Sequence, residues 1–517
     1  MPAKRDSLTF NCMGKFALSL VGLWASVFAM AALTGPGRID IVDGQTRFEV
    51  SQSLIDDGDS AVRDPRIWWG RFPGRDGLDF TYYRFPHSVL GAGAVWLADA
   101  TGPVSEGRRH FFFTMVGPFC CGLLAVLYAV WFRRIGLSPP ASLLWGAGGI
   151  FCTPNWYYGT STFDEFLCST VIIAALVTAC GGRGRHVGWA VGAGLLFGLA
   201  FNCKQPLAAF ALMGIALLDD RSRSRRYRLL SAWLIAAGVL VGIAVEQGYD
   251  RMKFPFDKKI VHAELYKLYG ENFANHQLAA IACVTVSLGA GAIWYFPPIF
   301  LTLAGLRVWW HFERRIVLAF LLASLPFLGF FLSFSFFKGD PAWGPRYLTP
   351  WFAILWLFAP AGAAKLSPFI VKLLLAAGVV VQALALSVDP HRLYVERDAS
   401  SGFGRVLPWL YFQPGISHIW NRPREIIEIA GATPPPEYTP APSPTFTFPI
   451  LDPPYLPERG RGVVERYRVL NGYRPFWLSM TTLPVDERPV NLGKAVGVLL
   501  MTLGCGLLLL APATRRN

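Results

Sequence analysis

Carboxylate and cationic side chains stand directly beside long apolar runs at four separate places in this sequence of 517 residues. A carboxylate can take a proton from a hydroxyl group as that group attacks, and cations can hold a phosphate while negative charge builds on it. Together they suit a group transfer from a lipid phosphate at the boundary between water and membrane. The candidate residues are Asp43, Asp164, Glu165, Lys204, Lys338 and Arg346.

The composition predicts that a polytopic membrane protein positions these residues. Hydrophobic residues make up 53% of the chain and charged residues only 16%, with a mean hydropathy of +0.38. Soluble proteins normally carry about 25% charged residues. The run 15–34 is long enough to cross about 30 Å of hydrocarbon, and it is expected to be a retained signal anchor. A soluble enzyme, a disordered chain and a fibrous protein are therefore excluded.

Twelve apolar segments predict twelve membrane spans with both termini in the cytoplasm. Every short loop rich in Lys or Arg then falls on the side of the N-terminus, as the positive-inside rule requires. These loops account for essentially the whole net charge of +14, so no nucleic-acid partner is needed to explain it. The segments lie near 15–34, 111–132, 141–158, 163–180, 187–202, 204–218, 228–247, 279–305, 316–337, 346–364, 368–388 and 493–511.

The remaining segments predict the domain organisation. Segment 86–99 is apolar but short, so it is expected to be a re-entrant or surface-lying helix within an outer loop, 35–110. The fold class is all-α, with about twelve transmembrane helices and a small periplasmic C-terminal segment that is α/β or loop-rich. The expected parts are a transmembrane domain (1–388), a proline-rich segment with a small domain (389–492), and a final span with a cytoplasmic tail (493–517).

Five of the six candidate residues also have a structural interpretation. Asp43 lies in an acidic loop, where a solvated carboxylate is ordinary. The acids at 164–165 suit a helix N-terminus, where they complement the macrodipole. Lys204 could extend to the membrane surface. Arg346, in the turn GDPAWGPRYL, could pair with Asp340, although a charge that enters a span is costly and favours a function.

Six pieces of sequence, in order, resemble the large-fold C-type membrane glycosyltransferases (GT-C). This superfamily includes protein O-mannosyltransferases and lipid A aminoarabinose transferases, and the likeness is closer to uncharacterised bacterial members. It covers about residues 15–388, and GPRYL is its most characteristic part. The pieces are VDGQTRFEVSQSLIDDGD, WYYGTSTFDEF, LLFGLAFNCKQP, YDRMKFPF, GAIWYFPPIFLTLAGL and AWGPRYLTPWF.

The resemblance implies an inverting transfer of a sugar from a polyprenyl-phosphate donor to a hydroxyl of a lipid, glycan or protein. Asp43 would be the general base. Glu165 or Asp164 would be a second acid that positions the acceptor or helps to hold a divalent metal. Lys204 and Arg346 would contact the donor phosphate, and Lys338 would add positive charge.

The same resemblance places the enzyme in the bacterial inner membrane, among lipids, with its site facing the periplasm. Two positions depart from the family pattern. Gly44 follows Asp43 where the mannosyltransferases have an Asp-Glu pair, and Lys204 stands where Arg is usual.

Two other functions remain as alternatives. A transporter or flippase of a lipid-linked glycan would need polar residues at mid-depth in the bilayer, whereas the charges here gather at one face. A non-catalytic assembly protein built around 389–492 would need that segment and would not need Asp43 or Arg346.

Overall fold

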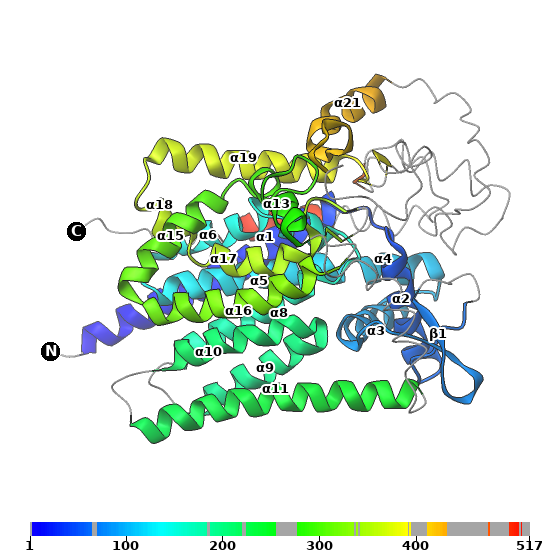
Figure 1. The fold of residues 1–517 in the computed structure, drawn as a ribbon, viewed down its shortest axis with the longest axis horizontal. Coiled ribbons are helices and arrows are strands. Elements are labelled where there is room, and N and C mark those ends of the chain that lie inside the picture. Colours follow the sequence, from blue (N-terminus) through cyan, green and yellow to red (C-terminus); the bar gives the residue numbers. More distant parts are fainter. Residues whose placement is uncertain are drawn as a thin grey trace.

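The computed structural model is a bundle of helices that lie roughly parallel to one another, with smaller elements gathered at one end (Figure 1). It describes residues 3–64, 70–182, 187–219, 224–254, 277–334, 338–339, 342–390, 392–393, 411–431, 474–475, 496–505 and 508. Almost all elements in these ranges are helical, which confirms the all-α polytopic fold predicted from the sequence.

Helix is present in all twelve segments that were predicted to span the membrane. Five helices among the described residues are long and apolar enough to cross a bilayer. They are α1 (Ala3–Thr34), α5 (Val116–Arg134) with α4 (Glu106–Thr114) before it, α11 (Arg225–Lys253), α16 (Arg314–Leu332) and α19 (Pro368–Ser387). The shorter ones include α8 (Glu165–Gly181), α9 (Gly188–Cys203), α13 (Gln277–Val286) and a helix at Val496–Cys505.

Four of the predicted spans are broken rather than continuous. Proline or glycine lies at or beside most of the breaks, because proline lacks the N–H that the helix interior needs and glycine favours non-helical backbone. Pro154, for example, separates two helices within segment 141–158. The broken pairs and triplets are α6 (Pro139–Phe151) with α7 (Asn155–Thr160), η2 (Gln205–Phe210) with α10 (Ala211–Leu218), α13 with α14 (Ala292–Tyr295) and α15 (Ile299–Phe312), and η3 (Arg346–Leu348) with α17 (Thr349–Trp356) and α18 (Ala359–Ala363).

Small residues hold the long helix α11 against α9. A Cβ added at Gly198 of α9 would lie 2.3 Å from the Gly238 carbonyl oxygen of α11, so the two backbones touch directly. Asn202 Nδ2 also donates to the Gly242 carbonyl oxygen across this contact, at 2.9 Å. In a membrane, such close approach of small residues and hydrogen bonds between helices replace the hydrophobic effect as the source of association.

The end of the bundle opposite the start of α1 carries a compact outer cap (Figure 1). It contains α2 (Val42–Asp56), α3 (Phe85–Ala100) and an antiparallel pair of strands, β1 (Arg71–Pro73) and β2 (Asp79–Thr81), with Phe72 opposite Phe80. The sequence did not predict this hairpin. The apolar segment 86–99 lies in α3, and its expected position at the membrane surface stays a prediction.

The C-terminal segment is described in part. Helix α21 (His418–Gly431) packs against α19, and the short stretch 474–475 is also placed. The proline-rich stretch 434–457 lies outside the described residues, as does the strand-like sequence around it apart from 474–475. The predicted division into domains therefore stays a prediction.

Candidate active site

Four regions distant in sequence meet at the outer end of the bundle. Asp43 lies in the first turn of α2, and the pair 164–165 forms the N-terminus of α8. Lys204 follows the last residue of α9, where the extended backbone before Pro206 ends the helix. Arg346 opens η3. The structure thus brings together five of the six residues that the sequence indicated.

The Lys204 ammonium lies between the two neighbouring acids. It is 3.1 Å from Asp164 Oδ1 and forms a short ion pair with Glu165 Oε1. The other oxygen of Asp164 pairs with Arg47 Nη2 at 3.1 Å. The Glu165 side chain is fully buried, so its charge depends on these cations, because an unpaired buried carboxylate would be very costly.

Arg346 connects this pair to the first outer loop. Its Nε lies 3.4 Å from Glu165 Oε1 and its Nη1 lies 3.9 Å from Asp43 Oδ2. The guanidinium stacks over the Phe163 ring at 4.1 Å, a cation–π contact that fixes its plane. Asp340, the structural partner considered from the sequence, lies outside the described residues. Among the described residues, Arg346 pairs with two of the three candidate acids, Asp43 and Glu165.

The turn before Arg346 has the backbone that its glycines predict. Gly339 and Gly344 have φ values of 89° and 63°, in the left-handed region that glycine adopts without strain. The Arg346 N–H donates to the Lys338 carbonyl oxygen at 2.9 Å, which closes the turn. A Cβ at Gly339 would lie 2.8 Å from Arg346 Nε, so a larger residue there would displace the guanidinium.

Asp43 is one of two partly exposed acids of the site. Its side chain and that of Asp164 are each 17% exposed, whereas that of Glu165 is 0% exposed, and Asp164 is paired with both Lys204 and Arg47. The Tyr83 hydroxyl donates a short hydrogen bond to Asp43 Oδ1. Burial and then the charge of Asp43 raise the pKa of Tyr83 well above its usual value, so this hydroxyl stays protonated and keeps donating.

Arg47 and Tyr83 were missed in the sequence. Arg47 stands four residues after Asp43, so both lie on the same face of α2, and its guanidinium stacks on the Tyr83 ring at 4.4 Å. Helical spacing could have indicated Arg47. Tyr83 follows strand β2, and only the fold of the outer cap brings it to Asp43.

Lys338 contributes its backbone to the turn before Arg346. Its ammonium lies over the Tyr411 ring, 5.3 Å from the centroid, while its carbonyl oxygen accepts from Arg346.

The described residues also provide no group of three His, Cys, Asp or Glu side chains that could hold a metal ion. Lys204 already occupies the place between the two adjacent carboxylates, so this donor set does not fit a divalent ion.

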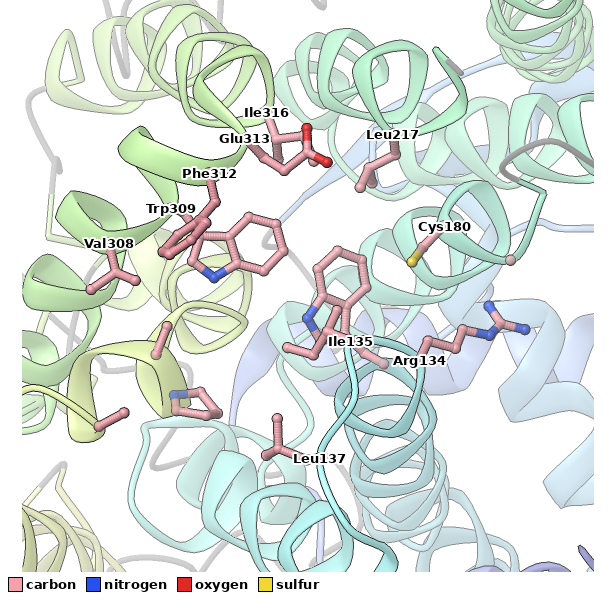
Figure 2. Close-up of a pocket in the computed structure, with 15 residues that line it drawn as sticks. Arg134, Ile135, Leu137, Cys180, Leu217, Val308, Trp309, Phe312, Glu313 and Ile316 are labelled. Carbon is pink, nitrogen blue, oxygen red and sulfur yellow. The ribbon is translucent and has the colours of Figure 1, made fainter. Parts of the chain in front are cut away.

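A separate cavity of about 630 Å³ lies at the other end of the bundle. Figure 2 shows its walls, where Trp309 and Phe312 of α15 face Ile135 and Leu217, with Arg134 and Glu313 near the edge. None of the candidate site residues lines this cavity. Its position on the predicted cytoplasmic side separates it from the candidate active site.

Comparisons with known proteins give structural neighbours only. No protein-family model and no curated protein matches the sequence. Among solved structures, the chain is similar to ArnT from Cupriavidus metallidurans bound to undecaprenyl phosphate, with 14% identity and a TM-score of 0.49 over 95% of this chain and 76% of that one. It is also similar to the oligosaccharyltransferase AglB from Archaeoglobus fulgidus in complex with an inhibitory peptide and a dolichol-phosphate, with 12% identity and a TM-score of 0.42 over 78% of this chain and 60% of that one.

Both neighbours are GT-C membrane glycosyltransferases, the group that the sequence motifs resemble. Their TM-scores lie below 0.5, and the chemistry of the site is therefore inferred from its own residues.

Proposed function

We propose that the protein is an inverting glycosyltransferase that moves a sugar from a polyprenyl-phosphate donor to an acceptor hydroxyl. The observation that carries this proposal is the meeting of a partly exposed carboxylate, Asp43, with two cations, Lys204 and Arg346, that lie beside the buried Glu165. A base and a phosphate-binding pair are the two components that such a transfer needs.

In the proposed reaction, Asp43 accepts the proton of the acceptor hydroxyl. The hydroxyl oxygen forms a bond to the anomeric carbon from the face opposite the phosphate, and the bond between that carbon and the phosphate oxygen breaks. The electron pair leaves with polyprenyl phosphate, whose new negative charge Arg346 and Lys204 stabilise. No step uses a metal ion.

The charge balance of the site supports this sequence of events. Arg346 lies between Asp43 and Glu165, and it is balanced by both carboxylates before reaction. When Asp43 becomes protonated, its attraction for Arg346 is lost at the moment when the leaving phosphate gains a charge. Arg346 is then free to interact more strongly with the leaving group, which is differential stabilisation of the transition state.

The proposed location is the outer face of the inner membrane, in contact with the periplasm. The site lies at the end of the bundle opposite the start of α1, whose first residues carry Lys4 and Arg5. If the basic loops face the cytoplasm, the site opens outward at the lipid boundary.

Undecaprenyl phosphate binding and donor cleavage test the proposal directly. Purified protein should show a higher thermal unfolding midpoint with undecaprenyl phosphate, and it should release this product from one member of a panel of polyprenyl-phosphate sugars. A wild-type protein that undecaprenyl phosphate does not stabilise would contradict the proposal. Movement of an intact lipid-linked glycan across vesicles without bond cleavage would favour a flippase.

Asp43→Asn is the matched mutational test of the base. The amide can still accept the Tyr83 hydrogen bond but cannot take a proton, so turnover should fall by about 10²–10⁴-fold with thermal stability nearly kept. Asp76→Asn is the control, since Asp76 is an exposed carboxylate in the same outer cap with a φ of 56°, which Asn tolerates. If Asp43→Asn turns over at the wild-type rate, Asp43 is not the general base.

A further inference from the structure

A single arginine from the C-terminal segment reaches into the loops that carry the candidate acids. The Arg474 side chain is 0% exposed, and its Nη2 lies 3.1 Å from Asp40 Oδ2. Its Nη1 donates to Thr160 Oγ1 at 2.7 Å, and its guanidinium stacks over the Tyr157 ring at 4.8 Å. Its backbone N–H donates to the Ser387 carbonyl oxygen at 2.9 Å, so the arginine is held at both ends.

Asp40 in turn connects Arg474 to the loop before α8. Its Oδ1 accepts from both the backbone N–H and the hydroxyl of Thr162, at 2.9 and 2.8 Å. Asp40 stands three residues before Asp43, and Thr162 stands three residues before Glu165. The network formed by Arg474, Asp40, Thr160 and Thr162 therefore ties together the two chain segments that carry the base and the buried acid.

A second buried ion pair joins the same outer loop to the start of the C-terminal segment. Arg38 Nη2 lies 3.2 Å from Asp389 Oδ2, and both side chains are nearly inaccessible to solvent. Arg38 and Asp40 lie two residues apart just before α2, so the described part of segment 389–492 contacts this loop at both residues. Such double attachment limits the freedom of the loop in front of Asp43.

We propose that Arg474 is a positioning residue for the active site, which makes the C-terminal segment part of the catalytic unit. Arg474 does not touch the proposed reacting groups. It acts through Asp40 and Thr162, which set the separation between Asp43 on α2 and Glu165 on α8. Since Arg346 lies between these two acids, a shift of either loop would alter the base and the phosphate-binding pair together. This inference rests on the proposed function for its catalytic meaning.

The first test compares Arg474→Met with Arg392→Met in the full-length protein. Arg392 is another poorly exposed arginine of the segment, and it pairs with Glu428 on α21. For Arg474→Met, we expect kcat in the folded fraction to fall about tenfold or more, with KM for the donor changed much less, because misplacement of a reacting group by about 1 Å can cost 10²-fold in rate. Arg474→Lys should restore part of the rate, and Arg392→Met should keep the wild-type kcat. A lower unfolding midpoint with wild-type kcat would overturn the proposal and leave Arg474 a stabilising residue only.

The second test needs no substrate and separates this inference from the proposed function. Amide hydrogen exchange should accelerate in segments 40–46 and 160–166 of Arg474→Met and should stay at the wild-type rate in those segments of Arg392→Met. If exchange accelerates in a protein that cleaves no donor, Arg474 does hold these two segments in place, and the proposed transferase function is wrong. Unchanged exchange in both segments would overturn the role of Arg474, whatever the activity.

Discussion

Asp43 and Glu165 have the same functional group but very different surroundings. Glu165 is enclosed by Lys204 and Arg346, whereas Asp43 keeps part of its carboxylate in contact with solvent and receives a hydrogen bond from Tyr83. A fully buried acid held by two cations is suited to positioning them, and an accessible acid is suited to meeting a substrate. We therefore propose Asp43 as the base and an organising role for Glu165.

Arg346→Lys should weaken undecaprenyl phosphate binding by roughly tenfold, and Arg346→Ala by more. The guanidinium can bind two phosphate oxygens at once, while an ammonium offers only one point charge, and hydrogen bonds to charged groups contribute about 1.5–3 kcal/mol. The measurement is a titration of the unfolding midpoint with undecaprenyl phosphate.

Arg63→Lys is the control for this change, because Arg63 forms exposed ion pairs with Asp57 and Asp59 in the outer cap. The contrary result would be an Arg346→Ala protein that is much less stable but whose folded fraction binds the ligand normally. Arg346 would then serve only to tie Asp43 to Glu165.

The sequence located most of these residues but could not predict which of them pair. The positive-inside rule put Asp43, Glu165, Lys204 and Arg346 at one membrane boundary, because each follows or precedes an apolar run. Pairing depends on side-chain directions that hydropathy does not contain. Arg474 could not be found at all from the sequence, since it lies far from any predicted span.

At the scale of elements, the order of apolar segments was predictable and their internal breaks were not. Hydropathy detects a run such as 346–364 without resolving that η3, α17 and α18 divide it. The hairpin β1–β2 was missed because each strand has only three residues, too few for an alternating pattern to be recognised. Contacts with other segments, such as Phe254 at the end of α11 and Ala61 against Phe80, give these short strands a place to pack.

Gly44→Ala should destabilise the contact between α2 and the loop before α8. A Cβ at position 44 would lie 2.1 Å from Thr162 Oγ1 and 2.5 Å from Thr162 Cβ, so the segments must move apart. Overpacking of this kind costs about 1–3 kcal/mol, which exceeds the gain of about 1 kcal/mol in helix propensity. This close approach also explains why no larger residue follows Asp43.

The comparison variant is Gly93→Ala on α3, where an added Cβ meets nothing within 4 Å. Gly93→Ala should leave the unfolding midpoint unchanged or raise it, whereas Gly44→Ala should lower both the midpoint and the turnover. Equal midpoints for the two variants would mean that the two segments do not pack as described.

The packing of α3 also predicts a pH dependence of stability. His87 is buried between Phe113 and Phe166, and burial, followed by the charge of Arg47, lowers its pKa to about 3, although Asp164 opposes this shift. The unfolded chain binds a proton near pH 6.5 and the folded protein does not. Stability from this group is therefore complete above about pH 6.5 and decreases as the pH falls toward 3, by up to about 1.4 kcal/mol per pH unit.

His87→Phe should remove this part of the acid sensitivity, because the ring is kept and the titration is lost. Unfolding midpoints measured between pH 7.5 and pH 4.5 should then fall less steeply than those of the wild type. His311→Phe, at an exposed position on α15, is the control and should retain the wild-type slope. An unchanged slope for His87→Phe would show that this histidine does not contribute to the acid sensitivity.

At the scale of the whole molecule, the two ends of the bundle differ in charge and in complexity. The end with the outer cap joins carboxylates and cations into one site, while the opposite end holds the start of α1, the end of α10 and the start of α11 (Figure 1). Since the basic loops predict that the second end is cytoplasmic, the site would open to the periplasm. The two contacts of Arg474 and Arg38 would then attach the C-terminal segment on that same outer side.

Cysteine labelling in spheroplasts tests this orientation. In a variant without native cysteines, Cys introduced at the exposed positions Asp76 and Trp420 should react with an impermeant maleimide, since both lie on the predicted outer side. Cys at Ser224, which is also exposed and begins α11, should react only after the membrane is opened. All three positions are exposed, so a difference in labelling reports the side of the membrane. Labelling of position 224 in sealed spheroplasts, with positions 76 and 420 protected, would invert the topology and place the proposed site in the cytoplasm.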